Sequence, residues 1–223
     1  KLAAENATRA ASFREAPQSV RTETERLARE LEDLPSVEEL LKRLDGQTTQ
    51  VLAQELESLR AEEVELRREL DTVERLDESL KVRPVDIGAR LPEATRELGI
   101  AAKALTSKEQ ATGTKPGEAA DLVLLQAQRE LLASEVEMLT QERLSLGVRG
   151  ELAEMRRKLL EGKLENTRTA IEALEKILES QRQTDVDRLA ARLAGMAATL
   201  GDDEELQALS TELHRLTKEL QDS

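Results

Sequence analysis

VLAQELESLRAEEVELRRELDTVERLDESLK, residues 51–81, carries an apolar stripe that advances in alternating steps of four and three residues. This heptad spacing places one face of a helix against a partner helix. The stretch therefore predicts a long helix over residues 48–81. We call the apolar members of its stripe the arm seam: Leu52, Leu56, Leu59, Leu66, Leu70, Val73 and Leu80.

The composition agrees with an all-helical chain. Among 223 residues, Phe13 is the one aromatic residue, and 35% of the residues are charged. Strands favour aromatic and β-branched side chains, whereas Leu, Ala, Glu and Arg dominate here. We predict an all-α protein, an elongated helical bundle with long antiparallel hairpins that resemble coiled coils.

The charge limits the partners that this chain can bind. A formal net charge of −13 disfavours nucleic acid and anionic lipid, because both are bound mainly by Lys and Arg. The absence of Cys removes disulfides and thiolate metal sites. No apolar run approaches the roughly 20 residues of a membrane-spanning helix.

Prolines suggest where helices begin and end. We expect a first helix to end at Glu15, before Pro17, and a second to continue to about Asp33. Ser36 is a plausible N-cap, accepting from the N–H of residue 38 or 39, for a short helix over residues 37–44 that Gly46 closes.

The arm helix is expected to end at Arg83-Pro84 and to return as a helix over residues 85–109. The sequence ATGTKPG, residues 111–117, predicts a turn, with Pro116 in the first turn of the next helix. This pattern predicts an N-terminal lobe over residues 1–110, with a hairpin arm over 48–110, and a C-terminal lobe over 116–223. One continuous domain is the alternative.

Two glycines, Gly147 and Gly150, interrupt the strongly helical LSLGVRGELAEMRRKLL of residues 144–160. Gly147 is expected to end one long helix and Gly150 to lead into the next. A last helix over residues 202–221 carries a second heptad seam: Leu206, Leu209, Leu213, Leu216 and Leu220. Both seams are candidate interaction surfaces, and burial within the chain is the favoured alternative.

Candidate chemistry is sparse. His214 is the one histidine and has no second metal ligand at suitable spacing. Acidic pairs such as Glu62-Glu63 are more often solvated than catalytic. GVRG matches the GxxG of nucleic-acid clamps, yet no strand precedes it. We predict no catalytic residue, no cofactor, no metal and no small-molecule ligand.

The order of the pieces resembles a known family. Five pieces follow one another over about residues 16–220: Ala16-Pro17, the heptad arm ending in Arg83-Pro84, LLQAQRELLASEVEMLTQERLSL, the glycine break and LAEMRRKLLEGKLENTRTAIEAL. In this order they resemble the periplasmic, porin-type helical domain of the MscK/KefA-like large mechanosensitive channels of the MscS superfamily. The tract DVDRLAARLAGMAATLGDD matches that pattern only loosely.

The resemblance implies a periplasmic segment of a bacterial inner-membrane channel, whose partners are the other subunits of a heptamer and the transmembrane and pore regions. The helix-like start at Lys1, without an initiator Met, suggests a piece of a longer protein. If this helical domain acts as a force-bearing lever, Gly147 and Gly150 are a possible hinge at which it bends. The rival hypothesis is a soluble coiled-coil scaffold or envelope adaptor that binds a partner through its leucine seams.

Overall fold

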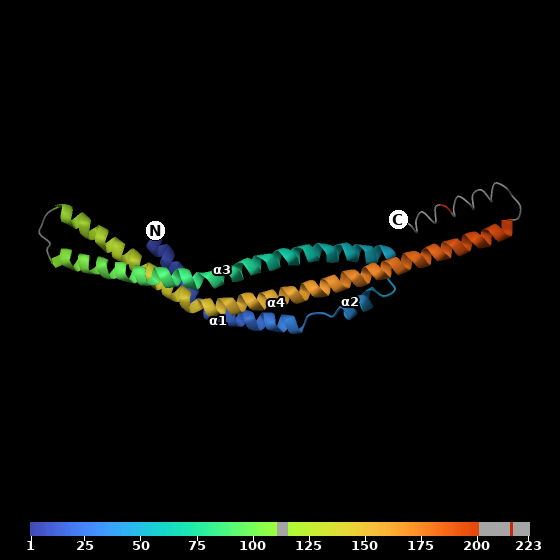
Figure 1. Cartoon of the computed structure of the whole chain (residues 1–223), viewed down its shortest axis with the longest axis horizontal. Coiled ribbons are helices and arrows are strands. Elements are labelled where there is room, and N and C mark those ends of the chain that lie inside the picture. Colours follow the sequence, from blue (N-terminus) through green and yellow to red (C-terminus); the bar gives the residue numbers. More distant parts are fainter. Residues whose placement is uncertain (111–115, 201–214, 216–223) are drawn as a thin grey trace. The chain divides into compact units, whose positions relative to one another are not determined.

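The computed structural model of the chain describes residues 1–110, 116–200 and 215, and all four elements that it contains are helices. The helices are α1 (Leu2–Glu32), α2 (Val37–Leu44), α3 (Thr49–Gln110) and α4 (Pro116–Leu200) (Figure 1). The predicted all-α class is confirmed, and α3 and α4 pack against each other in the manner of a helical hairpin.

The contacts within the chain divide it into two compact units. Unit 1 comprises Lys1–Leu34 and Arg67–Lys163, and unit 2 comprises Pro35–Leu66 and Leu164–Ser223. Each unit takes a segment of α3 and a segment of α4, because the two long helices are packed side by side. Local heptads in the sequence do not reveal such long-range pairing.

Unit 1 contains three helices. Its part of α3 runs antiparallel to its part of α4, because Arg83 pairs with Glu142 whereas the later Lys108 pairs with the earlier Asp121. α1 runs parallel to α4, with contacts that advance together along both helices. One buried cluster of unit 1 consists of Ala10, Ile87, Met138 and Leu139, with Phe13, Leu91 and Leu146 packed against it.

One glycine of unit 1 lies at a close contact between helices. A Cβ on Gly162 of α4 would lie 3.0 Å from Leu34 Cδ1 and 3.4 Å from Leu31 Cδ1. Both leucines lie at the end of α1 or just beyond it. Gly162 therefore lets the C-terminal end of α1 approach α4 closely, a role that its position in the sequence did not indicate.

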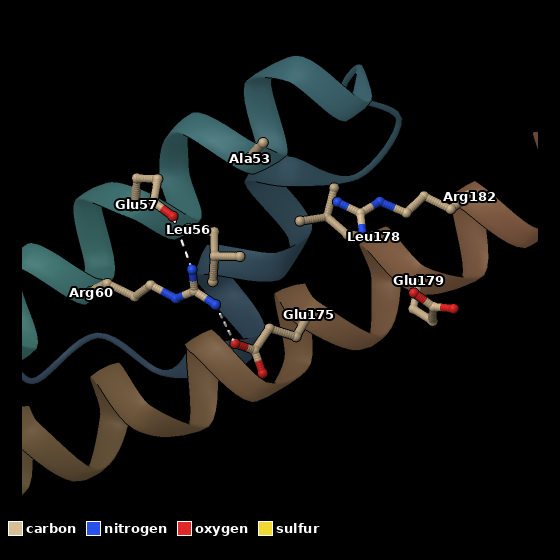
Figure 2. A pocket seen from close by; sticks show the side chains of 8 residues that line it. All are labelled: Ala53, Leu56, Glu57, Arg60, Glu175, Leu178, Glu179 and Arg182. Carbon is tan, nitrogen blue, oxygen red and sulfur yellow. Dashed lines mark hydrogen bonds and ion pairs between the residues drawn. The ribbon is translucent and has the colours of Figure 1, made fainter. Parts of the chain in front are cut away.

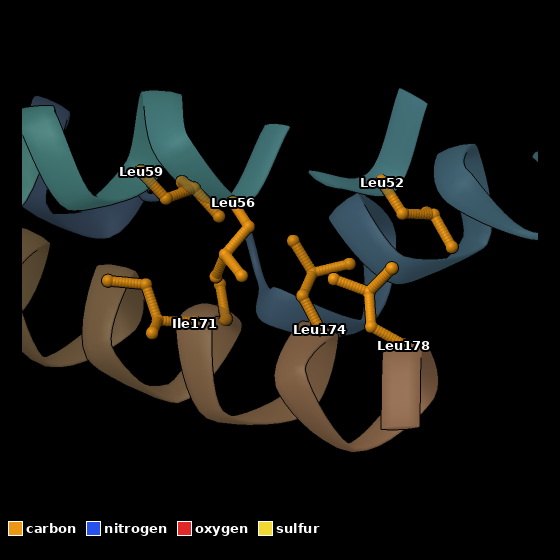
Figure 3. Close-up of a cluster of buried hydrophobic side chains, with 7 residues drawn as sticks. Leu52, Leu56, Leu59, Ile171, Leu174 and Leu178 are labelled. Carbon is orange, nitrogen blue, oxygen red and sulfur yellow. The ribbon is translucent and has the colours of Figure 1, made fainter. Parts of the chain in front are cut away.

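Unit 2 is built around the N-terminal part of the arm seam. Leu52, Leu56 and Leu59 of α3 face leucine and isoleucine side chains of α4, as Figure 3 shows. The α4 members of this cluster are Ala170, Ile171, Leu174 and Leu178. Apolar residues of α2 pack against the same cluster: Val37, Leu40, Leu41 and Leu44. The burial of these side chains is the main stabilising contribution in unit 2.

The short helix α2 begins and ends as its sequence predicts. The Ser36 hydroxyl accepts a hydrogen bond from the Glu39 N–H at 3.3 Å, which satisfies one of the free donors of the first turn. After the helix, Gly46 has a φ of 73°, in the left-handed region that glycine adopts without steric cost. The N-cap at Ser36 and the turn at Gly46 are confirmed.

The predicted helix ends at Pro17 and Pro84 are wrong. Pro17 lies inside α1, and Pro84 and Pro92 lie inside α3. All three prolines are exposed. Their rings remove one helical hydrogen bond each, but on the solvent side water can donate to the freed carbonyl, and packing of the opposite face sustains the helix. The arm therefore does not return at Pro84, and the partner of α3 is α4.

The predicted helix break at Gly147 and Gly150 is also wrong. Both glycines lie within the continuous helix α4, which begins at Pro116. Glycine inside a helix costs about 1 kcal/mol relative to alanine. Flanking residues that are buried against other helices, such as Ser145 and Ala153, offset this cost.

The unit 2 core gives a first prediction. Leu174 is completely buried, so Leu174→Ala should lower the free energy of unfolding by about 2–5 kcal/mol, measured as a shift of the urea midpoint. Leu189→Ala, on the same helix but 44% exposed, is the matched control and should cost far less. Equal losses in the two variants would show that the unit 2 core does not form as described.

Candidate functional site

The most organised polar feature is a pair of ion pairs between α3 and α4 in unit 1, which we call the ionic ladder. Arg83 binds Glu142 through Nε and Nη2, each 2.8 Å from a carboxylate oxygen. Arg90 binds Glu135 in the same two-pronged way, at 2.7 and 2.9 Å. Such fork-to-fork pairing fixes direction as well as distance, so the ladder defines the antiparallel register of the two helices.

Glu142 is the most buried charged group of the ladder, with 4% of its surface exposed. Its hydrogen bonds with Arg83 lower the pKa of its carboxyl below the ordinary value, against the opposing effect of burial, and the positive charges of Arg9 and Arg149 add to the lowering. Glu142 is therefore ionised at neutral pH. It is an acceptor of ion pairs and does not have the raised pKa of a general acid.

Arg90 is surrounded by carboxylates. Besides Glu135, it lies 3.0 Å from Glu93 and 3.1 Å from Glu97 of its own helix. The hydrogen bond with Glu135 contributes most to raising the pKa of Arg90, so the guanidinium stays charged at every relevant pH. Arg90 thus pairs with all three carboxylates.

A shallow groove of about 320 Å³ lies beside the ladder in unit 1, lined mainly by apolar side chains of all three helices. At its edge the Arg149 guanidinium stacks 5.1 Å from the centre of the Phe13 ring. This cation–π contact holds the arginine against α1. The remaining lining residues include Ala16, Val20, Leu76, Leu80, Leu152 and Arg156.

Unit 2 has a second depression, of about 330 Å³, between α3 and α4. Figure 2 shows Arg60 in it, reaching both Glu57 of its own helix, at 2.9 Å, and Glu175 of α4, at 2.8 Å. The charged groups thus neutralise one another across an open surface. This arrangement links two helices and offers no enclosed space for a small ligand.

The structure places the arm seam in the interior. Leu52, Leu56, Leu59, Leu66 and Leu80 are buried, and Leu70 and Val73 are partly buried. In the described part of the chain, this seam is thus covered by the protein itself. The second seam, Leu206 to Leu220, and His214 lie outside the described residues.

The other sequence candidates also lack site geometry. Gly147 and Gly150 are helical, so GVRG does not form the loop that a GxxG clamp needs. Glu63, from the acidic pair Glu62-Glu63, accepts a hydrogen bond from Arg168 Nε at 3.0 Å. Within residues 1–110, 116–200 and 215, no group of His, Cys, Asp or Glu could hold a metal ion. No helix among these residues is long and apolar enough to cross a membrane.

Sequence reasoning missed the ionic ladder, although a signal for it was present. Arg83 and Arg90 are seven residues apart, and so are Glu135 and Glu142. Equal heptad spacing of opposite charges on two helices indicates that they can pair in two successive steps, in either direction. Pro84 obscures this signal, because local propensity predicts that the arm ends at this proline.

Taken together, these helices form an all-α protein whose polar groups link helices to one another. The sequence profile of the family described as "Mechanosensitive ion channel porin domain" matches residues 2–208. The chain belongs to this family, the porin domain of the MscS-type mechanosensitive channels, and the predicted family is confirmed. The family is a channel domain and not a catalytic family. No curated protein and no solved structure matches the chain.

The ladder gives a prediction about pH. Because the pKa of Glu142 is lower in the folded chain, its stabilisation is present above the unfolded pKa of about 4.3 and is lost as the pH falls through the folded pKa. Glu142→Gln should lower the free energy of unfolding by about 1–3 kcal/mol at pH 7, and this deficit should shrink as the pH falls from about 5 to 3.

Urea unfolding of both proteins across this pH range measures the effect. Glu172→Gln, at an exposed position of the same helix, is the control and should leave stability nearly unchanged. A deficit for Glu142→Gln that stays constant down to pH 3 would contradict the assigned role of the carboxylate.

Proposed function

We propose that this chain is the non-catalytic periplasmic domain of a bacterial mechanosensitive ion channel in the inner membrane. The observation that carries the proposal is the family match over residues 2–208. The mutual neutralisation of Arg60 with Glu175 and of Arg83 with Glu142 supports a mechanical role rather than a chemical one. In this proposal the pore belongs to other parts of the channel, and this domain conducts no ions.

The contribution of the domain is subunit contact, or coupling of membrane tension or periplasmic state to the gate. Membership of the family suggests a multi-subunit channel, and the resemblance implies a heptamer. Paired long helices suit this role, because a helix resists stretching along its axis and transmits displacement between its ends. The ionic ladder supports it by opposing sliding between α3 and α4.

A scaffold that binds a partner through its leucine seams remains the rival hypothesis. The burial of the arm seam speaks against that seam as a binding surface, because Leu52, Leu56 and Leu59 already pack on α4. These contacts do not test partner binding through the second seam, over residues 206–220.

Deletion of the domain is the first test. In liposomes under patch clamp, the full-length protein should open under membrane tension, and deletion of this domain should shift the opening threshold, the inactivation or the assembly of the channel. If the full-length protein forms no tension-gated channel, the proposed function is wrong. If deletion changes none of the three properties, the domain has no mechanical role.

Gly147 and Gly150 give a second test. We propose that they form a compliant point within α4, because two glycines weaken the same helical turn. A Cβ at either position would meet no atom within 4 Å, so alanine fits both. Gly147→Ala plus Gly150→Ala should stabilise the chain by about 1–2 kcal/mol, slow local hydrogen exchange and change the channel threshold.

Gly195→Ala is the control, since this glycine also lies in α4 with open space for a Cβ. It should stabilise its own part of the helix without changing the threshold. If the double variant changes neither hydrogen exchange near residue 148 nor the threshold, the two glycines are not a hinge.

A further inference from the structure

α4 extends beyond the start of α3, its long partner helix in unit 2. The hydroxyl of Thr49, the first residue of α3, donates to Gln181 Oε1 of α4 at 3.1 Å. From this level α3 runs back along α4, since Arg60 of α3 pairs with the earlier Glu175. α4 itself continues to Leu200, roughly 28 Å further. α3 therefore does not cover this last part of α4.

The last part of α4 nevertheless carries an apolar stripe. Val186 and Leu193 lie one heptad apart and are partly buried, and the sequence places Leu200 one heptad further. We call these three residues the α4 end stripe. Arg188, two residues after Val186 and so about 200° around the helix, is exposed and lies 3.6 Å from Asp185. The helix is thus amphipathic beyond α3, and its apolar face needs a partner.

The segment that follows, residues 201–223, carries a stripe of the same length. Leu206, Leu213 and Leu220 of the second seam also lie one heptad apart, so each stripe spans about 21 Å of helix. Arg215, the one described residue of this segment, is helical and exposed. It lies two residues after Leu213, about 200° around a helix, so the seam is on the face away from the exposed Arg215.

The connection between the two stripes has the composition of a turn between helices. It reads GDDEE, residues 201–205. Gly201 suits the left-handed residue that ends a helix, and an Asp side chain can accept from the free N–H groups of the next first turn. The two glutamates then lie at the positive end of that helix dipole. Helices joined by about two to five residues commonly pack antiparallel, so this composition favours a reversal of the chain.

The phase of the two stripes also favours a reversal. Glycine alone does not decide the point, because Gly147 and Gly150 remain helical within α4. If α4 continued straight through Gly201, Leu206 would lie about 240° around the helix from Leu200. The two stripes would then face different sides of one straight helix, and neither could cover the other.

Reversal at residues 201–205 brings the two stripes to the same levels, because both repeat every seven residues away from the turn. The level pairs are Leu200 with Leu206, Leu193 with Leu213 and Val186 with Leu220. A short tether also gives the segment an effective concentration on the order of millimolar at the α4 end stripe. A separate chain must compete with that concentration, so the segment of the same chain is the favoured occupant.

The charges beside the stripes are compatible with this contact. In an antiparallel pair, the residue before each stripe position lies on the same side of the contact. Arg192 and Glu212 are then neighbours of opposite charge. Asp185 and Glu219 are neighbours of like charge, and the nearby Arg188, which lies 3.6 Å from Asp185, offsets their repulsion.

We infer that residues 204–221 form a helix that folds back on α4 and packs the second seam against the α4 end stripe. The contact extends unit 2 past the start of α3. Both leucine seams are then covered within the chain, so the rival scaffold hypothesis loses its remaining surface. The inference does not depend on the proposed channel function.

Paired cysteines in the whole chain of 223 residues test the contact, since the chain contains no cysteine of its own. On mild oxidation, Leu193→Cys plus Leu213→Cys should form a disulfide within one chain, because level positions of packed helices come within the roughly 7 Å that a disulfide requires. Leu193→Cys plus Leu220→Cys is the matched control, about 10 Å out of level on the same seam. It should react about tenfold more slowly or not at all.

Oxidation of an equal mixture of isotope-labelled and unlabelled chains separates the possible occupants. Disulfide-linked peptides that join a labelled to an unlabelled chain would show that a second copy covers the α4 end stripe, and would overturn the inference. Equal rates for the two cysteine pairs, or no disulfide in either, would show that no fixed register exists and would also overturn it. Peptides linked within one chain, formed mainly by the level pair, would support it.

Hydrogen exchange gives a readout that needs no cysteine. Leu213→Asp places a charge in the proposed contact, so amide exchange over residues 186–200 should accelerate about tenfold, while exchange over residues 170–178 of the unit 2 cluster stays unchanged. Thr211→Asp is the control, because it adds the same charge about 200° around the helix, on the outward face. Equal effects of the two variants, or no effect of Leu213→Asp, would overturn the inference.

Discussion

The antiparallel register of α3 and α4 is the constraint on which unit 1 depends. Two arginines on α3 meet two glutamates on α4 at equal heptad spacing, and the fully buried Ile87 lies between the two arginines in the sequence. An apolar seam alone tolerates sliding by a heptad, because leucine fits against leucine at several registers. A shift at the ladder would leave Glu142 buried and unpaired, which is far more costly. Charge thus specifies the register, and apolar burial supplies most of the stability.

Unit 2 follows the same design with less charge: its leucines pack on α4 and α2, and Arg60 joins α3 to α4 at the surface. The depression described in each unit is open at the surface.

Sequence reasoning identified the fold class, the arm seam and the capping of α2, because these depend on neighbours within a few residues. It failed at Pro17 and Pro84, where local propensity predicted helix ends. A proline costs one hydrogen bond, and long helices whose opposite face is buried over many turns can accept that cost at an exposed position. The heptad pattern in fact continues beyond Pro84, through Ile87 and Ala94, both of which are fully buried.

The sequence by itself determined that this chain is helical, that its arm has one apolar stripe, and that it carries the features of a channel-domain family. Composition and periodicity suffice for the first two conclusions, since both are local properties, whereas the third rests on the order of the motifs along the chain. The tertiary structure decided which helices pair, in which direction and at which register. It also decided that Gly162 packs closely against Leu31 and Leu34 and that Gly147 and Gly150 remain helical. These outcomes depend on contacts between residues separated by tens of positions, and their free energy appears only when both partners are in place.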